Sequence, residues 1–418
     1  MNYVIIGNST AAVGAVEAIR QVDQRNPVTI ISDEPYHTYS RPLISYFLAG
    51  KVTEDKMLYR PRDFYVDNKV GLFLGKKAVS LDIPGCKVQL EDGDTVAYDR
   101  LLLATGGKPF VPRTEGLGKA NIFTFSCWDD VQRIKEKVQV NTKAVVVGGG
   151  LTGLKAAESL SMLGVDVTVV ELADRVLSTI LDPQAAALIQ KVLDEQNIKC
   201  YLGTTVSEIL GEDKVSGVML QDGTQLACDM LIFAIGITPN TDLVKDTTVE
   251  TNRGIVVDKH MRTSVNGIYA AGDVAEGYDL LFKKNRVLAT LPNAYKQGET
   301  AGRNMAGVPS AYSGSFAFNA ISFFNFPIIT AGLQVAEGDM EEDIEVDEET
   351  STYRKILLKD DNIIGFMFLN EVDRAGILTG IIRDSLDIGE FKDHIADMEF
   401  GYACFPKKLR KTRLFGGV

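Results

Sequence analysis

The clearest pattern of hydrophobic and polar positions lies between Lys143 and Glu171. A run of β-branched residues, Val145–Val147, predicts a buried strand that ends abruptly in glycines. Residues at helical spacing follow, and a second apolar run, Val165–Val170, predicts another strand that ends on Glu171. The order strand, helix, strand is typical of a parallel α/β unit.

Glycines stand at the start of the predicted helix with the spacing G-x-G-x-x-G. Gly148 allows the tight turn, Gly150 lets the backbone approach a pyrophosphate, and Gly153 lets the helix pack on the sheet. Free amides at the helix start would face the phosphates. Glu171, at the end of the second strand, would bind the ribose hydroxyls and repel a 2′-phosphate, which favours NAD over NADP. An ordinary glycine-rich turn is the alternative, but the full strand–turn–helix–strand context argues against it.

The first residues repeat this pattern in a weaker form. A predicted strand, Tyr3–Ile6, precedes Gly7, while Ser9 and Ala12 stand where the second and third glycines would be. Both are small, so close backbone approach remains possible. The helix and strand predicted next are Ala11–Val22 and Val28–Ile31, and Asp33 and Glu34 follow them. A second nucleotide-binding unit in one chain strengthens both predictions.

Further strands end in glycine turns. Tyr98–Pro109 and Cys228–Thr241 share one pattern, an apolar strand followed by a glycine turn, and this echo indicates two related domains. The strand Gly267–Ala271 leads to Asp273, whose carboxylate would point into a ligand crevice. The helix predicted over Leu291–Gly307 could direct its positive N-terminal dipole at an anionic ring system.

Arg41 allows two interpretations. It lies just after the first predicted unit, where a cation could meet a pyrophosphate, and Pro42 is suited to begin a helix that runs to Ala49. A surface arginine beside an ordinary helix is the alternative. The local pattern taken alone favours the surface arginine.

The composition changes after Gly314. Phenylalanines cluster there, and an acidic stretch, Glu337–Glu349, precedes two strands that alternate around a turn at Asp360–Asn362. The residues Lys407–Arg413 are basic. Both charged runs are interpreted as solvated faces, with docking surfaces for a partner as the alternative.

The composition is that of a globular protein with room for two or three domains. The net charge of -12 disfavours nucleic acid or an anionic membrane as the main partner. No apolar run is long enough to span a bilayer and no signal-peptide pattern is visible, so we expect a cytoplasmic protein. Five scattered cysteines suit a reducing compartment, and we expect them to be small buried hydrophobes. Neither they nor the three isolated histidines show metal-ligand spacing, so no metal site is predicted.

Together these motifs resemble the FAD- and NAD(P)H-dependent pyridine nucleotide–disulfide oxidoreductase superfamily, over roughly residues 1–310. The resemblance implies an α/β fold with two Rossmann-like domains, the FAD domain being split by an inserted NAD domain, and a C-terminal α+β domain. The expected boundaries are 1–112 and 242–313 for the FAD domain, 113–241 for the NAD domain and 314–418 for the C-terminal interface domain.

The resemblance also assigns site residues. FAD is expected at the first fingerprint, after the second strand, at the A-T-G turn, at the G-D motif and at the helix after it: Gly7, Ser9, Thr10, Ala11, Ala12, Asp33, Arg41, Ala78, Ala104, Thr105, Gly106, Gly272, Asp273, Asn293, Ala294 and Gln297. NAD(H) is expected at Gly148, Gly150, Leu151, Thr152, Gly153, Glu171, Ala234 and Gly236.

Within the superfamily, the stretch PY-x-x-YSRPLIS is similar to NADH:rubredoxin reductases and to the flavin domain of NADH-dependent nitrite reductases. The chain also resembles FAD subunits of larger anaerobic oxidoreductases that link NAD to iron–sulfur proteins. Two departures are Ser9, in place of a usual glycine, and Lys155, where many relatives carry a glutamate near the nicotinamide. The helix Pro42–Ala49 also lacks the flavin-adjacent cysteine that disulfide reductases of this fold require.

These features predict an NADH:acceptor flavoenzyme without a catalytic side chain. Hydride would pass from nicotinamide to flavin N5, and electrons would then go to rubredoxin, ferredoxin or an iron–sulfur subunit, or run in reverse. The chain could form a homodimer or belong to a hetero-oligomer. The alternatives are an NADH oxidase that reduces oxygen, and a non-catalytic flavoprotein subunit or NADH sensor.

Overall fold

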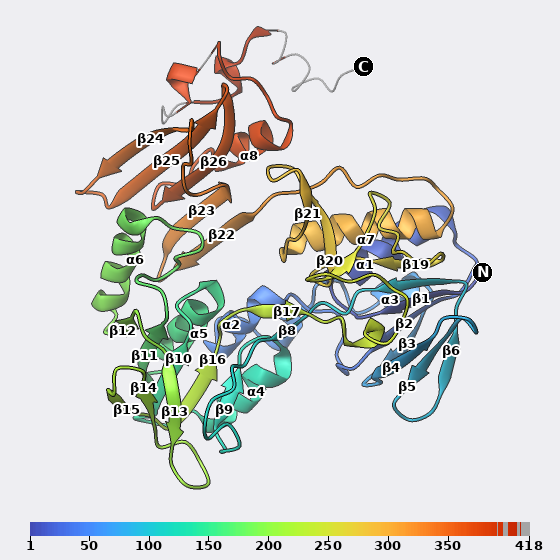
Figure 1. The fold of residues 1–418 in the computed structure, drawn as a ribbon, viewed down its shortest axis with the longest axis horizontal. Helices are drawn as coiled ribbons and strands as arrows, with labels where there is room; N and C mark the ends of the chain where they lie inside the picture. Colours follow the sequence, from blue (N-terminus) through green and yellow to red (C-terminus); the bar gives the residue numbers. More distant parts are fainter. Residues whose placement is uncertain (391, 396–399, 408–409, 411–418) are drawn as a thin grey trace.

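The N-terminal sheet draws its strands from two distant parts of the chain. The computed structural model describes residues 1–390, 392–395, 400–407 and 410. Five parallel strands have the order β19-β7-β1-β2-β3, and β19 comes from far beyond the other four (Figure 1). The elements of this layer are β1 (Tyr3–Ile6), α1 (Thr10–Val22), β2 (Val28–Ser32), α3 (Phe64–Asp67), β3 (Val70–Leu74), β7 (Arg100–Leu103), β19 (Ile268–Ala270) and α7 (Leu291–Met305).

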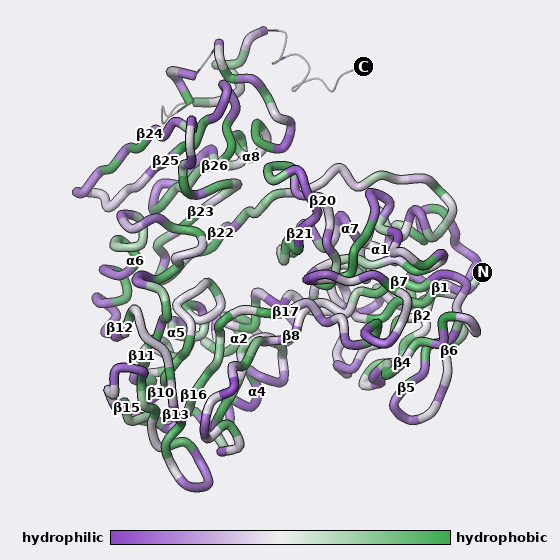
Figure 2. Tube along the Cα trace, in the orientation of Figure 1, coloured by the Kyte–Doolittle hydropathy of each residue, from purple (hydrophilic) through white to green (hydrophobic). Residues whose placement is uncertain are grey.

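A second parallel sheet lies between these segments in sequence. Its order is β12-β11-β10-β16-β9, and its strands are largely apolar (Figure 2). Its elements are β9 (Ile122–Thr124), α4 (Trp128–Lys137), β10 (Lys143–Val147), α5 (Leu151–Met162), β11 (Asp166–Glu171), α6 (Pro183–Glu195), β12 (Lys199–Leu202) and β16 (Met230–Phe233). The α/β fold class predicted from the sequence is therefore confirmed.

Smaller sheets complete these two parts. The pair β8 and β17 consists of the segments that run between the two parallel sheets, and the two strands are antiparallel. The remaining strands are β4 (Ala78–Asp82), β5 (Lys87–Leu90), β6 (Thr95–Ala97), β8 (Gly107–Pro109), β13 (Val206–Leu210), β14 (Gly217–Leu220), β15 (Gln225–Ala227), β17 (Ile237–Pro239), β18 (Ile255–Val256), β20 (Ala275–Asp279) and β21 (Lys284–Val287).

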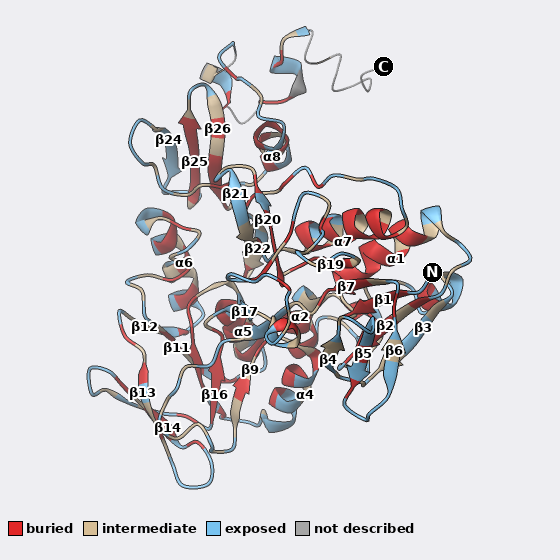
Figure 3. Cartoon of the chain, turned by 45° about the vertical axis from the view of Figure 1, so that its right-hand side comes forward, coloured by how far each residue is buried: buried red, intermediate tan, exposed pale blue. Residues whose placement is uncertain are grey.

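The C-terminal part contains an antiparallel sheet with the helix α8 beside it. The order is β22-β23-β26-β25-β24, and the edge strand β24 is the predicted acidic stretch. All residues of β24 are exposed, whereas β25 is almost entirely buried (Figure 3). The bounds are β22 (Phe318–Phe323), β23 (Phe326–Gly332), β24 (Glu341–Asp347), β25 (Thr352–Lys359), β26 (Asn362–Leu369) and α8 (Ala375–Arg383).

The helix expected over Pro42–Ala49 is present, but it starts one residue earlier and consists of two pieces. The structure begins it as a 3₁₀ turn, Arg41–Leu43, and continues it as α2, Ile44–Leu48. This segment packs on α4 and α5 of the second part, where the Tyr36 ring stacks on Trp128 with centroids 5.2 Å apart. The segment after β2 therefore joins the two nucleotide-binding parts.

The expectation that every cysteine is buried is wrong. Cys86 and Cys404 are exposed, and Cys228 alone is fully buried. Cys86 lies in a surface turn with φ 50°. Cys127 and Cys200 are half-buried. None of the helices in the described ranges is both long enough and apolar enough to span a membrane.

Candidate nucleotide sites and family

The two glycine loops are built in the same way. Gly7 N–H donates to Ile31 O and Gly148 N–H donates to Val170 O, each at 2.8 Å. Both glycines have φ near +110°, and a Cβ on either would stand within 2.5 Å of a carbonyl oxygen in the next strand's end, that of Ala104 or Ala234. Only glycine fits either position, which explains why both loops begin with it.

A helix follows each loop, and no side chain caps the first amides of either helix. The N-cap residues are Ser9 for α1 and Gly150 for α5, and neither helix has a side-chain hydrogen bond at its start. The hydroxyl of Thr10 is also buried without a hydrogen-bond partner in the described part of the chain. Unpaired donors at a helix N-terminus suit a phosphate.

Helix α7 closes over the first loop. A Cβ on Gly298 would stand 2.0 Å from Ala11 O, so only glycine lets α7 lie against α1. Gln297 is fully buried; its Oε1 accepts the N–H of Gly272 at 2.8 Å, while its Nε2 has no partner among the described residues. The G-D motif, α7 and the first loop therefore lie together.

Asn293 and Ala294 are also buried in the first turns of α7. The Asn293 side chain is engaged by the protein itself, since its Nδ2 donates to Leu288 O at 2.8 Å and its Oδ1 accepts from Tyr312 Oη. Its side-chain amide is thus occupied, which leaves its backbone as the available group. Ala294 instead contributes a small surface, and its Cβ lies 3.7 Å from the Cβ position of Gly272.

Asp273 and Arg41 come close to each other from distant segments. Burial raises the pKa of the Asp273 carboxyl, and the nearby Arg41 acts in the opposite direction. Arg41 forms an ion pair with Glu34 and donates to Ser126 O at 3.0 Å. Burial acts against the charge of Arg41, but Tyr39 and Glu34 outweigh it and raise the pKa of the guanidinium. The Arg41 side chain is still 41% exposed, so its guanidinium could also bind a pyrophosphate.

Asp33, the acid expected to bind the FAD ribose, does not lie at the position that corresponds to Glu171. Strand register pairs Ile6 with Ile31 and Val147 with Val170, so Ser32, not Asp33, stands at the position of Glu171. Asp33 is exposed, and its carboxylate accepts the N–H of the next residue at 3.0 Å. The neighbouring Glu34 is half-buried and holds Arg41. Sequence reasoning gave Glu34 no role because the arginine contact spans seven residues of irregular chain.

The A-T-G turn lies at the connection between the two parts. Thr105 Oγ1 donates to Asn240 O at 2.7 Å, and Gly106 has φ +65° with open space around its Cβ position. Gly236, in the matching turn of the second part, has the same open space and φ +103°. Ala78, the first residue of β4, is half-buried.

Glu171 is held by the backbone of the second loop. Its two oxygens accept the N–H groups of Gly149, at 2.5 Å, and Ala173, at 2.8 Å. The nearest arginine in sequence, Arg175, is bound within its own loop, to Asp174 at 2.7 Å and to the carbonyl of Leu181 at 3.3 Å. Arg175 is therefore not paired with Glu171 and is already bound to other groups, so it is not placed to bind a 2′-phosphate beside Glu171.

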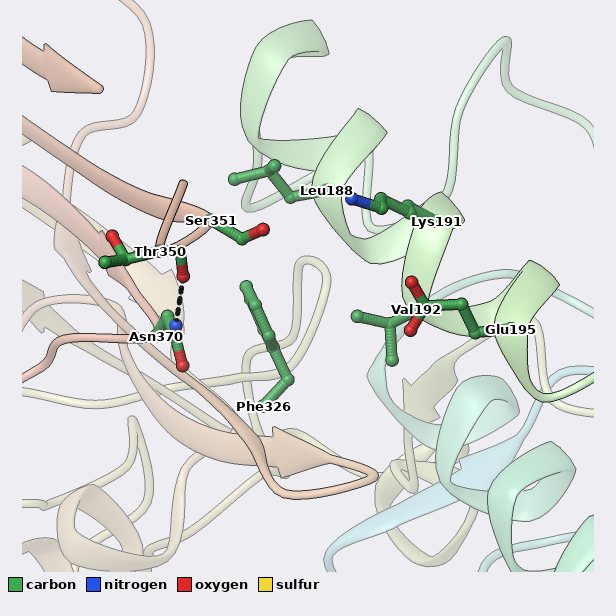
Figure 4. Close-up of a pocket in the computed structure, with 8 residues that line it drawn as sticks. All are labelled: Leu188, Lys191, Val192, Glu195, Phe326, Thr350, Ser351 and Asn370. Carbon is green, nitrogen blue, oxygen red and sulfur yellow. Dashed lines mark hydrogen bonds between the residues drawn. The ribbon is translucent and has the colours of Figure 1, made fainter. Parts of the chain in front are cut away.

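Lys155 is enclosed rather than open to a ligand. Only 11% of its side chain is exposed, and its ammonium forms an ion pair with Glu158 on the same helix. No described group of His, Cys, Asp and Glu side chains could hold a metal ion. A cavity of about 220 Å³ elsewhere, between α6 and the C-terminal sheet, contains none of the predicted site residues (Figure 4).

The geometry fits two dinucleotides, because the chain has two glycine loops, each followed by a helix start without a side-chain cap. Comparison with known proteins agrees with this. The profile of the pyridine nucleotide-disulphide oxidoreductase family matches residues 1–298. The chain belongs to this family. It is an FAD-dependent NAD(P)H oxidoreductase whose cofactors are FAD and NAD(H).

Three similar proteins describe its place in the family. The chain is 31% identical to the NADH-dependent phenylglyoxylate dehydrogenase subunit epsilon of Aromatoleum evansii, over 92% of each protein. It is 32% identical to nitrite reductase [NAD(P)H] of Bacillus subtilis (strain 168), where 93% of the chain matches 48% of the relative, so it spans about half of that protein. The reductase in a covalent putidaredoxin reductase–putidaredoxin complex superposes with a TM-score of 0.85 at 27% identity, covering 92% of this chain and 94% of that one.

Proposed function

We propose that this protein moves electrons between NAD(H) and a separate redox protein. The observation that carries the proposal is the pair of equivalent nucleotide loops, joined through β8 and β17, in a chain whose flavin-side helix has no thiol. FAD, when bound, would accept a hydride from NADH and release electrons to an acceptor. The chain contributes binding and orientation, not a nucleophile.

The residues of the first part would hold FAD. The amides of Thr10, Ala11 and Ala12 meet the pyrophosphate, helped by the charge of Arg41. Asp273 would hold the polyol chain, and the start of α7 would approach the ring through the backbone of Asn293 and the small side chain of Ala294. The other residues of this proposed site are Gly7, Ser9, Asp33, Ala78, Ala104, Thr105, Gly106, Gly272 and Gln297.

The residues of the second part would hold NAD(H). The amides of Leu151 and Thr152 meet its pyrophosphate, and Glu171 takes the ribose hydroxyls. Ala234 and Gly236 leave the carboxyl end of β16 open for the nicotinamide half. The remaining members of this site are Gly148, Gly150 and Gly153.

The acceptor is proposed to be rubredoxin, ferredoxin or an iron–sulfur subunit. The end-to-end match to a subunit of a dehydrogenase, and the superposition on a reductase bound to putidaredoxin, both support a protein acceptor. We further propose that the protein works in the cytoplasm, since its five cysteines are unpaired.

The purified protein should be yellow, and NADH should bleach its flavin under anaerobic conditions. NADPH should be less effective by about 100-fold in kcat/KM, because placing a 2′-phosphate against Glu171 costs several kcal/mol. Stopped-flow absorbance with both donors measures this. Equal rates with NADPH would contradict the ribose assignment, and a flavin that NADH does not reduce would contradict the function. Rapid reoxidation in air, with slow transfer to redox proteins, would favour an NADH oxidase instead.

Activity should not depend on cysteine. Burial raises the pKa of the thiols of Cys127 and Cys200 to about 11 and that of Cys228 to about 12, so these three are protonated and unreactive near neutral pH. A variant with all five cysteines replaced by Ser or Ala should lose about 1 kcal/mol or more at Cys228 and little at the exposed sites. Its NADH-to-dye turnover per bound flavin should stay within twofold of the natural protein. If thiol alkylation stopped flavin reoxidation but not reduction, a cysteine would lie on the electron path.

A further inference from the structure

Lys155 lies where three separate segments of the chain meet. It projects from the second turn of α5, the helix whose first amides form the proposed NAD site. Its ammonium is 4.5 Å from the centre of the Tyr46 ring on α2 and 3.3 Å from Ser322 O on β22. One side chain thus contacts the segment that follows Arg41, the NAD-binding helix and the C-terminal sheet.

Glu158 extends this contact. Its side chain is 5% exposed, and one of its oxygens binds the Lys155 ammonium. The other, Oε1, accepts the N–H of Phe324 at 2.9 Å. Phe324 and Asn325 both have positive φ and form the tight turn between β22 and β23. A single carboxylate therefore holds both the lysine and the turn of the C-terminal hairpin.

A hydroxyl group also links α5 to α2 beside the ion pair. Ser159 Oγ lies 2.9 Å from Ser45 O on α2 and 2.6 Å from Lys155 O on its own helix, so its one proton is shared between these two acceptors, and both serines are buried. The packing of α2 on α5 thus includes polar contacts with defined geometry beside its apolar core. Apolar packing alone tolerates small sliding, whereas buried charges and hydrogen bonds accept one arrangement.

At this junction the positive charge of Lys155 neutralises the negative charge of the buried Glu158. Removing Lys155 would leave Glu158 buried without its cation, and a buried unpaired charge is strongly unfavourable. The turn at Phe324 would then move, or water would enter between α2 and α5. Either change would alter how the NAD helix sits relative to α2, and a displacement of about 1 Å can slow a positioned reaction by about 100-fold.

We propose that Lys155, through Glu158, is a positioning residue that holds the NAD helix at a fixed distance from α2 and the C-terminal hairpin for hydride transfer. The inference rests on the proposed function and adds to it a role for the C-terminal part: the β22–β23 turn helps to set the geometry of the nucleotide sites. This role belongs to residues that are far apart in sequence.

The test compares variants by single-turnover reduction of the flavin with NADH. Lys155→Met should keep its FAD but slow reduction at saturating NADH by at least about tenfold. Lys155→Arg should stay within about threefold, because the guanidinium can still pair with Glu158. The double variant Lys155→Met/Glu158→Gln should recover part of the loss, because it removes the unpaired carboxylate but keeps an oxygen for Phe324.

Lys135→Met is the matched control. Lys135 is an exposed lysine on α4 whose ammonium lies 4.7 Å from the Phe47 ring of α2, and it forms no ion pair with a carboxylate of the described residues. Its loss should leave the reduction rate unchanged. Should Lys155→Met lack FAD, the double variant and Lys155→Arg carry the comparison instead.

Two failures can be told apart. If NADH does not reduce the flavin of the natural protein, the proposed function is wrong. If the natural protein is reduced but Lys155→Met reacts within twofold of it, or differs only in thermal stability, the positioning role is wrong. A double variant slower than Lys155→Met would likewise contradict the charge-balance argument.

Discussion

Replacing Asp273 with alanine is expected to lower the affinity for FAD by about 10- to 100-fold, because a hydrogen bond to a charged group contributes about 1.5–3 kcal/mol. The carboxylate stands just after β19, beside Gly272 and close to Arg41, and burial raises its pKa. A bound hydroxyl group would stabilise the charged form that burial disfavours. The FAD content after purification and a titration of the apoprotein, followed by flavin fluorescence, measure the effect.

Asp246→Ala serves as the control, since this carboxylate is exposed and lies before β18, outside the proposed FAD site. Asp273→Asn should fall between the two, because its amide keeps the size but not the charge. If Asp273→Ala bound FAD as tightly as Asp246→Ala, the assignment of the G-D motif would be wrong, although the family membership would stand.

Much of the fold follows from short patterns that are complete within about 30 residues. The strand, glycine turn and helix around Gly148 appear where the spacing predicts them, and so does the weaker copy around Gly7. In both cases the backbone permits only glycine at the turn, so the residue type and the local structure are tightly linked. The two antiparallel strands on either side of Asp360 also lie where the alternation of polar and apolar residues predicts them.

What the sequence did not show depends on contacts between distant segments. Lys155 donates a hydrogen bond to the carbonyl of Ser322, which is 167 residues away in sequence, so no local sequence pattern could predict this contact. Glu34 holds Arg41 because the irregular chain after β2 folds back on itself. The exposure of Cys86 depends on a turn at its own position, where a general expectation about cysteine burial fails.

The second glycine loop allows ligand space to be separated from protein packing. A Cβ on Gly150 would meet no atom within 4 Å, whereas a Cβ on Gly153 would stand 1.9 Å from Gly148 O. Gly150→Ala should therefore cost the protein about 1 kcal/mol or less in stability, as expected for an exchanged helix cap. It should nevertheless weaken NADH binding by about tenfold or more, because the new methyl group occupies the space proposed for the pyrophosphate.

Gly153→Ala should behave differently. The methyl group must push the helix away from its own loop, so stability should fall by about 1–3 kcal/mol and NADH binding should fall with it. Thermal unfolding and NADH titration of both variants, each with FAD bound, separate the two effects. Comparable losses of stability in both variants would show that Gly150 serves packing alone. Unchanged NADH affinity in Gly150→Ala would place the pyrophosphate elsewhere, since an open position at an uncapped helix start has value only if a ligand approaches it.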